Sequence, residues 1–240
     1  MPSKTEVVCM KTIGLLGGMS WESTVTYYRI INEEINRRLG GHHSARLSLF
    51  SVDFDEIEIL QHREDWDGTA EILGAAAERV ERGSADFLLI CTNTMHKIAG
   101  EIGARIRIPI VHIADATAEA IVSRGVKTVG LMGTRFTMED NFYKGRLEVK
   151  YGLEVLIPEK EDRELIHRVI YDELCLGKIR GTSRENFLAI IQELHERGAQ
   201  GVILGCTEIS LLVGQEDTNV PLFDTTEIHA LKAVEMALAE

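Results

Sequence analysis

The sequence has few cysteines, no long apolar run and no excess of positive charge. Its four cysteines are scattered without a Cys-x-x-Cys pair or a Cys/His cluster of zinc spacing, which argues against a disulfide scaffold and a metal site. No apolar run approaches the roughly 18 residues that a membrane-spanning helix requires, and the first residues contain no apolar signal core. The formal net charge of −12 disfavours nucleic acid and anionic membranes as partners. We therefore expect a reduced, cytoplasmic protein without a metal.

The composition that is present suits a globular protein, with 240 residues, 45% hydrophobic and 27% charged. Short apolar runs rich in β-branched residues alternate with longer segments of helical period, which is typical of α/β proteins with parallel sheets. The predicted strands are 12–16, 46–52, 87–91, 110–113, 128–132, 154–157, 202–205 and 222–223. The predicted helices are 22–38, 69–82, 115–124, 162–175, 184–197 and 226–237.

Part of the chain is repeated. Residues 11–17 (KTIGLLG) recur as 127–133 (KTVGLMG), and residues 108–110 (IPI) recur as 220–222 (VPL). We expect two pseudo-symmetric lobes, each a parallel sheet flanked by helices, with the active site in the cleft between them. The predicted first lobe comprises 10–113 and 220–240, the second comprises 114–219, and 1–9 is a possible extension.

Two polar motifs follow apolar runs at equivalent places in the repeat. They are Cys-Thr-Asn-Thr at 91–94 and Gly-Cys-Thr-Glu at 205–208. Ligands of open α/β sheets bind at the carboxyl ends of the strands, and a thiol at such an end, facing a helix N-terminus, can be partly ionised. The Gly-rich turn at 14–20 is either a simple turn or one that binds a carboxylate. Two proton-active side chains at equivalent strand ends suggest two catalysts that face one substrate.

These motifs, together with residues 13–19, resemble the aspartate/glutamate racemase family over nearly the whole chain. Within it, the sequence is most similar to the branch of aspartate/glutamate and broad-specificity amino-acid racemases. The resemblance implies racemisation without pyridoxal phosphate or another cofactor: one residue removes the α-proton from one face, and a second delivers a proton to the other. It also implies a homodimer and a small amino acid, aspartate or glutamate, as the substrate.

The first motif departs from the family pattern Cys-Asn-Thr. Alignment on Asn93-Thr94 puts Thr92 at the base position, whereas an ungapped alignment of the two halves puts Cys91 there. A shift of one residue turns a side chain to the opposite face of a strand, so both cannot serve. We favour Thr92 and Cys206 as the catalytic pair. A threonine hydroxyl is a poor base, so we expect a preference for L-substrates, which Cys206 would deprotonate.

Without pyridoxal, backbone and hydroxyl donors must stabilise the carbanion. The residues expected to bind substrate are Met19, Ser20, Asn93, Thr94, Thr134, Arg135, Thr137, Thr207 and Glu208. His96 either orients a base or is structural. Cys175 stands where aspartate racemases of this family carry a lysine, so a neutral polar amino acid is an alternative substrate. Further alternatives are a hydantoin racemase, a maleate isomerase, an arylmalonate decarboxylase, or an amino-acid-binding protein without catalysis.

Overall fold

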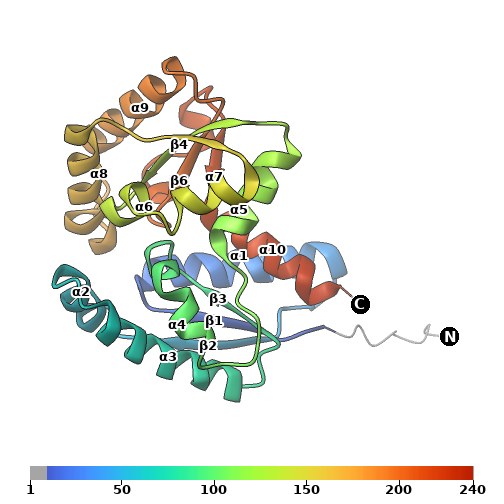
Figure 1. The fold of residues 1–240 in the computed structure, drawn as a ribbon. Coiled ribbons are helices and arrows are strands. Elements are labelled where there is room, and N and C mark those ends of the chain that lie inside the picture. Colours follow the sequence, from blue (N-terminus) through green and yellow to red (C-terminus); the bar gives the residue numbers. More distant parts are fainter. Residues whose placement is uncertain (1–9, 240) are drawn as a thin grey trace.

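The computed structural model describes residues 10–239, which form two parallel β-sheets joined and covered by helices (Figure 1). The first sheet has the order β2 (Leu47–Ser51), β1 (Ile13–Gly17), β3 (Phe87–Ile90). The second has the order β5 (Glu154–Leu156), β4 (Thr128–Gly133), β6 (Val202–Gly205), β7 (Leu222–Asp224). Neighbouring strands run parallel in both sheets. The predicted two-lobed α/β fold is confirmed, and the possible extension at 1–9 lies outside the described residues.

Helices cover both faces of the first sheet. One face packs on α1 (Trp21–Leu39) and α10 (Thr225–Leu238), and the other packs on α2 (Phe54–His62), α3 (Trp66–Arg82) and α4 (Ala99–Gly103). Neighbouring residues of β1 point to opposite faces, so Leu15 joins the cluster of α1 and α10 while Leu16 joins that of α3. The central strands are therefore buried on both sides, as their continuous apolar sequences indicate.

Further helices pack around the second sheet (Figure 1). They are α5 (Ile113–Ser123), α6 (Arg135–Glu139), α7 (Lys144–Tyr151), α8 (Lys160–Asp172) and α9 (Gly181–Glu196). Four short 3₁₀ turns complete the described secondary structure: η1 (Thr94–Ile98), η2 (Leu174–Leu176), η3 (Ile209–Leu211) and η4 (Gln215–Asp217).

Close packing explains why the repeat places a glycine in the first strand of each lobe. A Cβ atom on Gly14 would lie 2.7 Å from both the Phe87 carbonyl and a methyl of Val80 in α3. In the second lobe, a Cβ on Gly130 would lie 3.0 Å from a methyl of Leu194 in α9. Each glycine therefore lets the covering helix approach the central strand closely.

Two sequence predictions are corrected. The predicted strand at 110–113 is reduced to a single bridge between Ile110 and Leu88, because α5 begins at Ile113, where the His112 side chain caps the helix. The predicted boundary at 220 assigns β7 to the first lobe, yet β7 pairs with β6 in the second sheet. Only α10 returns to the first lobe, where it packs against α1. The rest of the lobe division stays a prediction.

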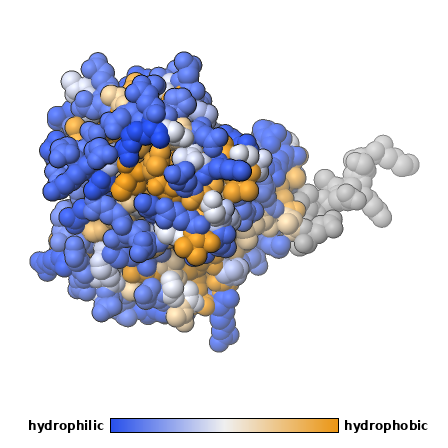
Figure 2. Space-filling view, turned by 45° about the horizontal axis from the view of Figure 1, so that its top comes forward, coloured by the Kyte–Doolittle hydropathy of each residue, from blue (hydrophilic) through white to orange (hydrophobic). Residues whose placement is uncertain are grey.

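The surface in Figure 2 is mostly hydrophilic, with a smaller apolar area near the middle of the visible face. Among residues 10–239, none of the helices combines the length and the apolar character needed to cross a membrane.

Candidate active site

The two motifs meet at one small cavity between the sheets. The first-lobe residues that line it are Met19, Phe54, Gln61, Thr92, Thr94 and Met95. The second-lobe residues are Thr134, Ile170, Tyr171, Cys175, Cys206 and Glu208. The cavity offers about 20 Å³ to the centres of water molecules, which is room for about one water. The lobes are therefore closed over the site in this structure.

Topology explains why these side chains meet. β3 ends at Ile90 and β6 ends at Gly205, and each lies beside the central strand of its own sheet. The chain then leaves each strand with its polar residues at the carboxyl end, where ligands collect in open α/β sheets. The equivalent position of the two strands brings Thr92 and Cys206 to the same cavity from opposite lobes.

The structure separates the two candidates for the first base. Cys91 is fully buried in the core cluster that contains Leu15 and Tyr27, and burial raises the pKa of its thiol. Thr92, one residue later, lines the cavity. The geometry therefore favours Thr92 over Cys91 as the first-lobe partner of Cys206.

Cys206 lies against the buried carboxylate of Glu208. The Cys206 thiol donates to Glu208 Oε2 at 2.9 Å, and the Thr207 hydroxyl donates to the same oxygen at 2.8 Å. On the other oxygen, Glu208 Oε1 accepts from the Ser20 hydroxyl at 2.7 Å and from the Ser20 N–H at 3.3 Å. The carboxylate of Glu208 thus contacts the Cys206 thiol of its own lobe and Ser20 in the Gly-rich turn of the first lobe.

This environment keeps the proton on the sulfur at rest. Burial raises the pKa of Cys206 well above its usual value, and the negative charge of Glu208 raises it further. Burial likewise raises the pKa of Cys175, the second thiol at the cavity. Cys206 must therefore lose its proton to a neighbour before it can act as a base.

A pair of threonine hydroxyls also bridges the lobes. Thr94 Oγ1 lies 3.0 Å from Thr134 Oγ1, so these two side chains form a hydrogen bond across the cleft. Thr134 also accepts from the N–H of Thr137 at 3.3 Å and caps α6. Thr137 therefore supports a cavity residue from behind.

The remaining predicted residues take different places. Asn93 is buried beside the cavity, where its Nδ2 donates to Thr225 Oγ1 at 3.0 Å, and its Oδ1 has no hydrogen-bond partner within residues 10–239. Arg135, expected to bind substrate, does not line the cavity. Its side chain is 52% exposed, and its guanidinium lies 3.5 Å from Glu64 at the surface. The structure therefore does not bring Arg135 to the other predicted residues.

Sequence reasoning missed part of the cavity wall. Phe54 and Gln61 come from α2, a helix that the sequence did not predict, and Ile170 and Tyr171 come from the end of α8. Nothing in the sequence pattern marks these four residues as part of a site. Cys175 does carry a signal, because the family resemblance aligns it with a side-chain-binding lysine.

The cavity contains no cationic side chain. None of its lining residues is lysine or arginine. Lys97, in the turn that follows the first motif, donates to Asp140 at 2.8 Å. Within residues 10–239, no group of three or more His, Cys, Asp or Glu side chains is placed so that it could hold a metal ion.

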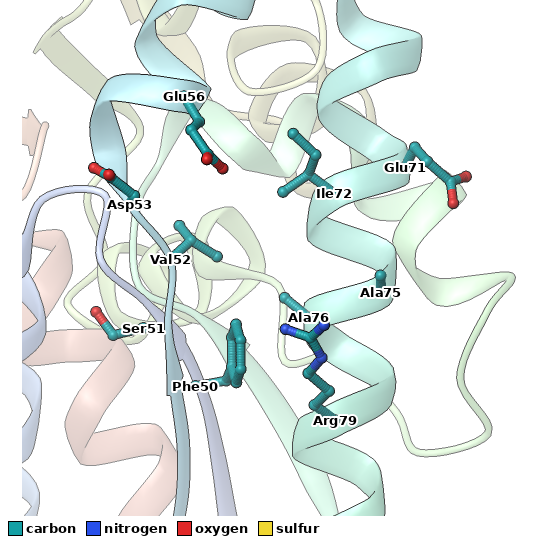
Figure 3. A pocket seen from close by; sticks show the side chains of 10 residues that line it. All are labelled: Phe50, Ser51, Val52, Asp53, Glu56, Glu71, Ile72, Ala75, Ala76 and Arg79. Carbon is teal, nitrogen blue, oxygen red and sulfur yellow. The ribbon is translucent and has the colours of Figure 1, made fainter.

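A larger hollow of about 450 Å³ lies elsewhere in the first lobe, between the end of β2 and helices α2 and α3 (Figure 3). Its wall combines Phe50, Val52 and Ile72 with the guanidinium of Arg79, which stacks 4.7 Å from the Phe50 ring centre. It shares no lining residue with the cavity of Thr92 and Cys206. Size alone therefore does not identify the reactive site here.

Residues 16–233, which include both motifs, match the family described as Asp/Glu/hydantoin racemase. The chain belongs to this racemase family. The resemblance seen in the sequence is thereby confirmed, and the protein is an enzyme of the isomerase class.

Relatives of this racemase cover almost its whole length. A candidate Asp/Glu racemase from Yersinia pestis is 52% identical, with a TM-score of 0.88, over 96% of this chain and 100% of its own. An aspartate racemase homologue from Pyrococcus horikoshii is 38% identical, with a TM-score of 0.80, over 95% and 99% of the two chains. The broad-specificity amino-acid racemase RacX of Bacillus subtilis is 22% identical over 95% of this chain and 98% of its own.

Proposed function

We propose that this protein racemises an amino acid without a cofactor, by a two-base mechanism that uses Thr92 and Cys206. The observation that carries the proposal is the meeting of these two side chains, from opposite lobes, at one closed cavity. Removal of a proton from one face and delivery to the other requires a proton-active group on each side of the α-carbon. Homodimer formation stays a prediction from the family.

Glu208 is the proposed acceptor of the Cys206 proton. The thiol already donates to Glu208 Oε2 at 2.9 Å, so a short transfer leaves a thiolate and a protonated carboxyl. The thiolate then removes the α-proton of the substrate, and the thiol is restored. The hydroxyl of Thr92 donates its proton to the opposite face of the carbanion. Water then carries the proton of Glu208 to Thr92, which restores both groups.

The carbanion is proposed to be stabilised by hydroxyl donors. Thr94 and Thr134 bond to each other across the cleft in the closed cavity. A substrate carboxylate placed between them would accept a hydrogen bond from each, which stabilises the negative charge that develops as the α-proton leaves. Ser20, which bonds to Glu208, would hold that carboxylate beside Cys206.

The two bases differ strongly in acidity, so the reaction is proposed to favour one hand. A thiolate can remove an α-proton, whereas the hydroxyl of Thr92 is a far weaker acid and its alkoxide is scarcely formed near neutral pH. Deprotonation from the Cys206 side is therefore fast and deprotonation from the Thr92 side is slow. Following the family's assignment of the second cysteine, we propose that the preferred substrate is the L-enantiomer.

The side chain of the substrate is the point where family and geometry differ. Relatives described as aspartate racemase homologues support the acidic substrate expected from the sequence. The cavity wall supports the alternative, a neutral polar side chain, because it holds the carboxylate of Glu208 and no cation. A second carboxylate on the substrate would have no charged partner there, and burial of an unpaired charge is costly. We favour the neutral polar substrate.

The test is α-proton exchange in deuterated water, followed by NMR, with a panel of L- and D-amino acids. The panel includes aspartate, glutamate, serine, homoserine, asparagine and glutamine. We expect rapid α-proton exchange of L-amino acids with neutral polar side chains, accompanied by slower inversion, and much slower exchange of their D-enantiomers. Equal rates for the two enantiomers would contradict the unequal bases.

Three variants separate the roles of the residues. Cys206→Ala is expected to abolish exchange, Thr92→Ala to abolish inversion, and Cys91→Ala to leave both rates within about threefold. Loss of activity in Cys91→Ala with full activity in Thr92→Ala would reverse the assignment of the first base. Binding of an amino acid without any exchange in the unaltered protein would indicate a binding protein in place of an enzyme.

A further inference from the structure

His96 lies behind the catalytic cavity with both ring nitrogens engaged. It belongs to η1, immediately after the first motif, and its side chain is 3% exposed. Its Nδ1 lies 2.8 Å from the carbonyl oxygen of Thr92. Its Nε2 accepts from the backbone N–H of Ile113 at 3.1 Å. His96 does not line the cavity, but it contacts the main chain of a residue that does.

These two contacts determine where the ring carries its proton. A backbone N–H can only donate, so Nε2 of His96 must offer a lone pair. The proton of the neutral ring is then on Nδ1, and the ring donates to the Thr92 carbonyl. Burial lowers the pKa of His96 from 6.5 to about 4, so this neutral form holds at neutral pH. The histidine is therefore a fixed link between Thr92 and Ile113.

Ile113 is the residue at which the chain enters the second lobe, as the first residue of α5. A second histidine ties the returning segment to the same place. His229 of α10 lies 2.7 Å from the Val111 carbonyl through Nε2, and its ring centre lies 5.9 Å from that of His96. Both crossings between the lobes thus converge on His96.

We propose that His96 is a positioning residue that couples closure of the lobes to the placement of Thr92. Any rotation of the second lobe about the crossing moves the Ile113 N–H, and the ring transmits this movement to the Thr92 carbonyl. The Thr92 hydroxyl then reaches the carbanion only when the lobes are closed. This inference rests on the proposed function, since it assigns a role within the same two-base reaction.

The reaction offers a readout that a merely structural role would not change. With an L-substrate in deuterated water, return of deuterium from Cys206 gives exchange with retention, whereas delivery by Thr92 gives inversion. Displacement of Thr92 alone lowers inversion and leaves retention. A loss of folded enzyme lowers both rates in the same proportion.

We would measure both rates for His96→Gln and His96→Asn. Glutamine removes the donor at the Nδ1 position, and we expect the ratio of inversion to retention to fall about a hundredfold, the effect of a displacement of about 1 Å. Asparagine keeps an N–H donor near that position but loses the acceptor for Ile113, so we expect an intermediate ratio. Thermal unfolding monitors how much of each variant is folded.

A second variant tests the link without a change at the histidine. Ile113→Pro removes the N–H that donates to Nε2, and proline is favoured at the first position of a helix. The ratio should fall here as well. The matched control is His195→Gln, because His195 Nδ1 contacts the carbonyl of Ala199 at 2.8 Å, also four residues away, at the end of α9. This control should keep the ratio of the unaltered enzyme.

Each result has one meaning. An unchanged ratio in the His96 variants and in Ile113→Pro, with both rates falling together, would overturn the positioning role while racemisation by Thr92 and Cys206 stands. Absence of exchange in the unaltered protein with every amino acid of the panel would overturn the proposed function itself. A selective loss of inversion in either the His96 variants or Ile113→Pro would support the inference.

Discussion

Acidification should destabilise the protein through the histidines that join the two lobes. Burial lowers the pKa of His96 from 6.5 to about 4 and that of His229 from 6.5 to about 3. As the pH falls, the unfolded chain therefore takes up protons before the folded protein does. The stabilising contribution of the neutral rings is complete above pH 6.5 and is lost progressively as the pH decreases toward 4.

The size of the effect follows from the separation between the folded and unfolded values. One pH unit of separation corresponds to about 1.4 kcal/mol, so His96 alone accounts for about 3 kcal/mol by pH 4. His229 adds a contribution of similar size over the same range. Since the free energy of unfolding of a protein is typically about 5–15 kcal/mol, we expect acid unfolding to begin between about pH 5 and 4.

The assay is urea unfolding followed by circular dichroism at several pH values between 7 and 4.5. His229→Gln removes one titrating ring, while its amide can still donate to the Val111 carbonyl. The dependence of the unfolding free energy on pH should therefore weaken in this variant. His42→Gln, in the exposed loop after α1, serves as the control. A free energy that is constant from pH 7 to 4.5, or an equal slope in His229→Gln, would refute the reasoning.

Two further predictions concern the thiol and the closed lobes. Glu208→Gln removes a negative charge that raises the pKa of Cys206. Because two charges about 4 Å apart interact by up to about 4 kcal/mol at an effective dielectric constant of 20, the pH midpoint of Cys206 alkylation should fall by about one to three units. Peptide mass spectrometry measures this midpoint, and an unchanged value would contradict the role of Glu208. Lys97→Met removes an ion pair to Asp140 and a contact at 5.7 Å with the ring of Phe136 in α6, both across the lobes and together worth about 1–2 kcal/mol. Alkylation of Cys206 in the unliganded enzyme should therefore accelerate about tenfold. Lys150→Met, which removes a pair to Asp115 between α7 and α5 within the second lobe, should leave that rate unchanged.

Much of the fold follows from sequence signals that act locally. The central strands are continuous apolar runs because both of their faces are covered, and their glycines at equivalent positions reveal the repeat. The helix α2 was not predicted because it has only nine residues and because Ile57 is the one apolar residue that it fully buries, so its apolar residues do not mark one buried face. The predicted strand at 110–113 does not continue to its expected end, because His112 caps the helix that begins at Ile113. The sequence did not indicate this cap, since the contact forms only in the folded chain.

The candidate site was predictable where it lies at strand ends and less so where it depends on how helices pack. Thr92 and Cys206 follow buried strands, so their meeting could be expected from topology. Arg135 also follows a strand, at the start of α6, but its long side chain extends to the surface toward Glu64. Tyr171 reaches the cavity from the last turn of α8. A sequence pattern does not contain the distances between helices that decide such contacts.

The late return of the chain to the first lobe constrains the order of events during synthesis on the ribosome. Ala230 and Val234 of α10 complete the core on one face of the first sheet, beside Tyr27. That face stays open to water until α10 has been made. Residues 114–224, by contrast, hold the whole second sheet in one uninterrupted segment. The second lobe can therefore complete its sheet before the first lobe does, although it is translated later. The first lobe completes its core only after α10 has been translated.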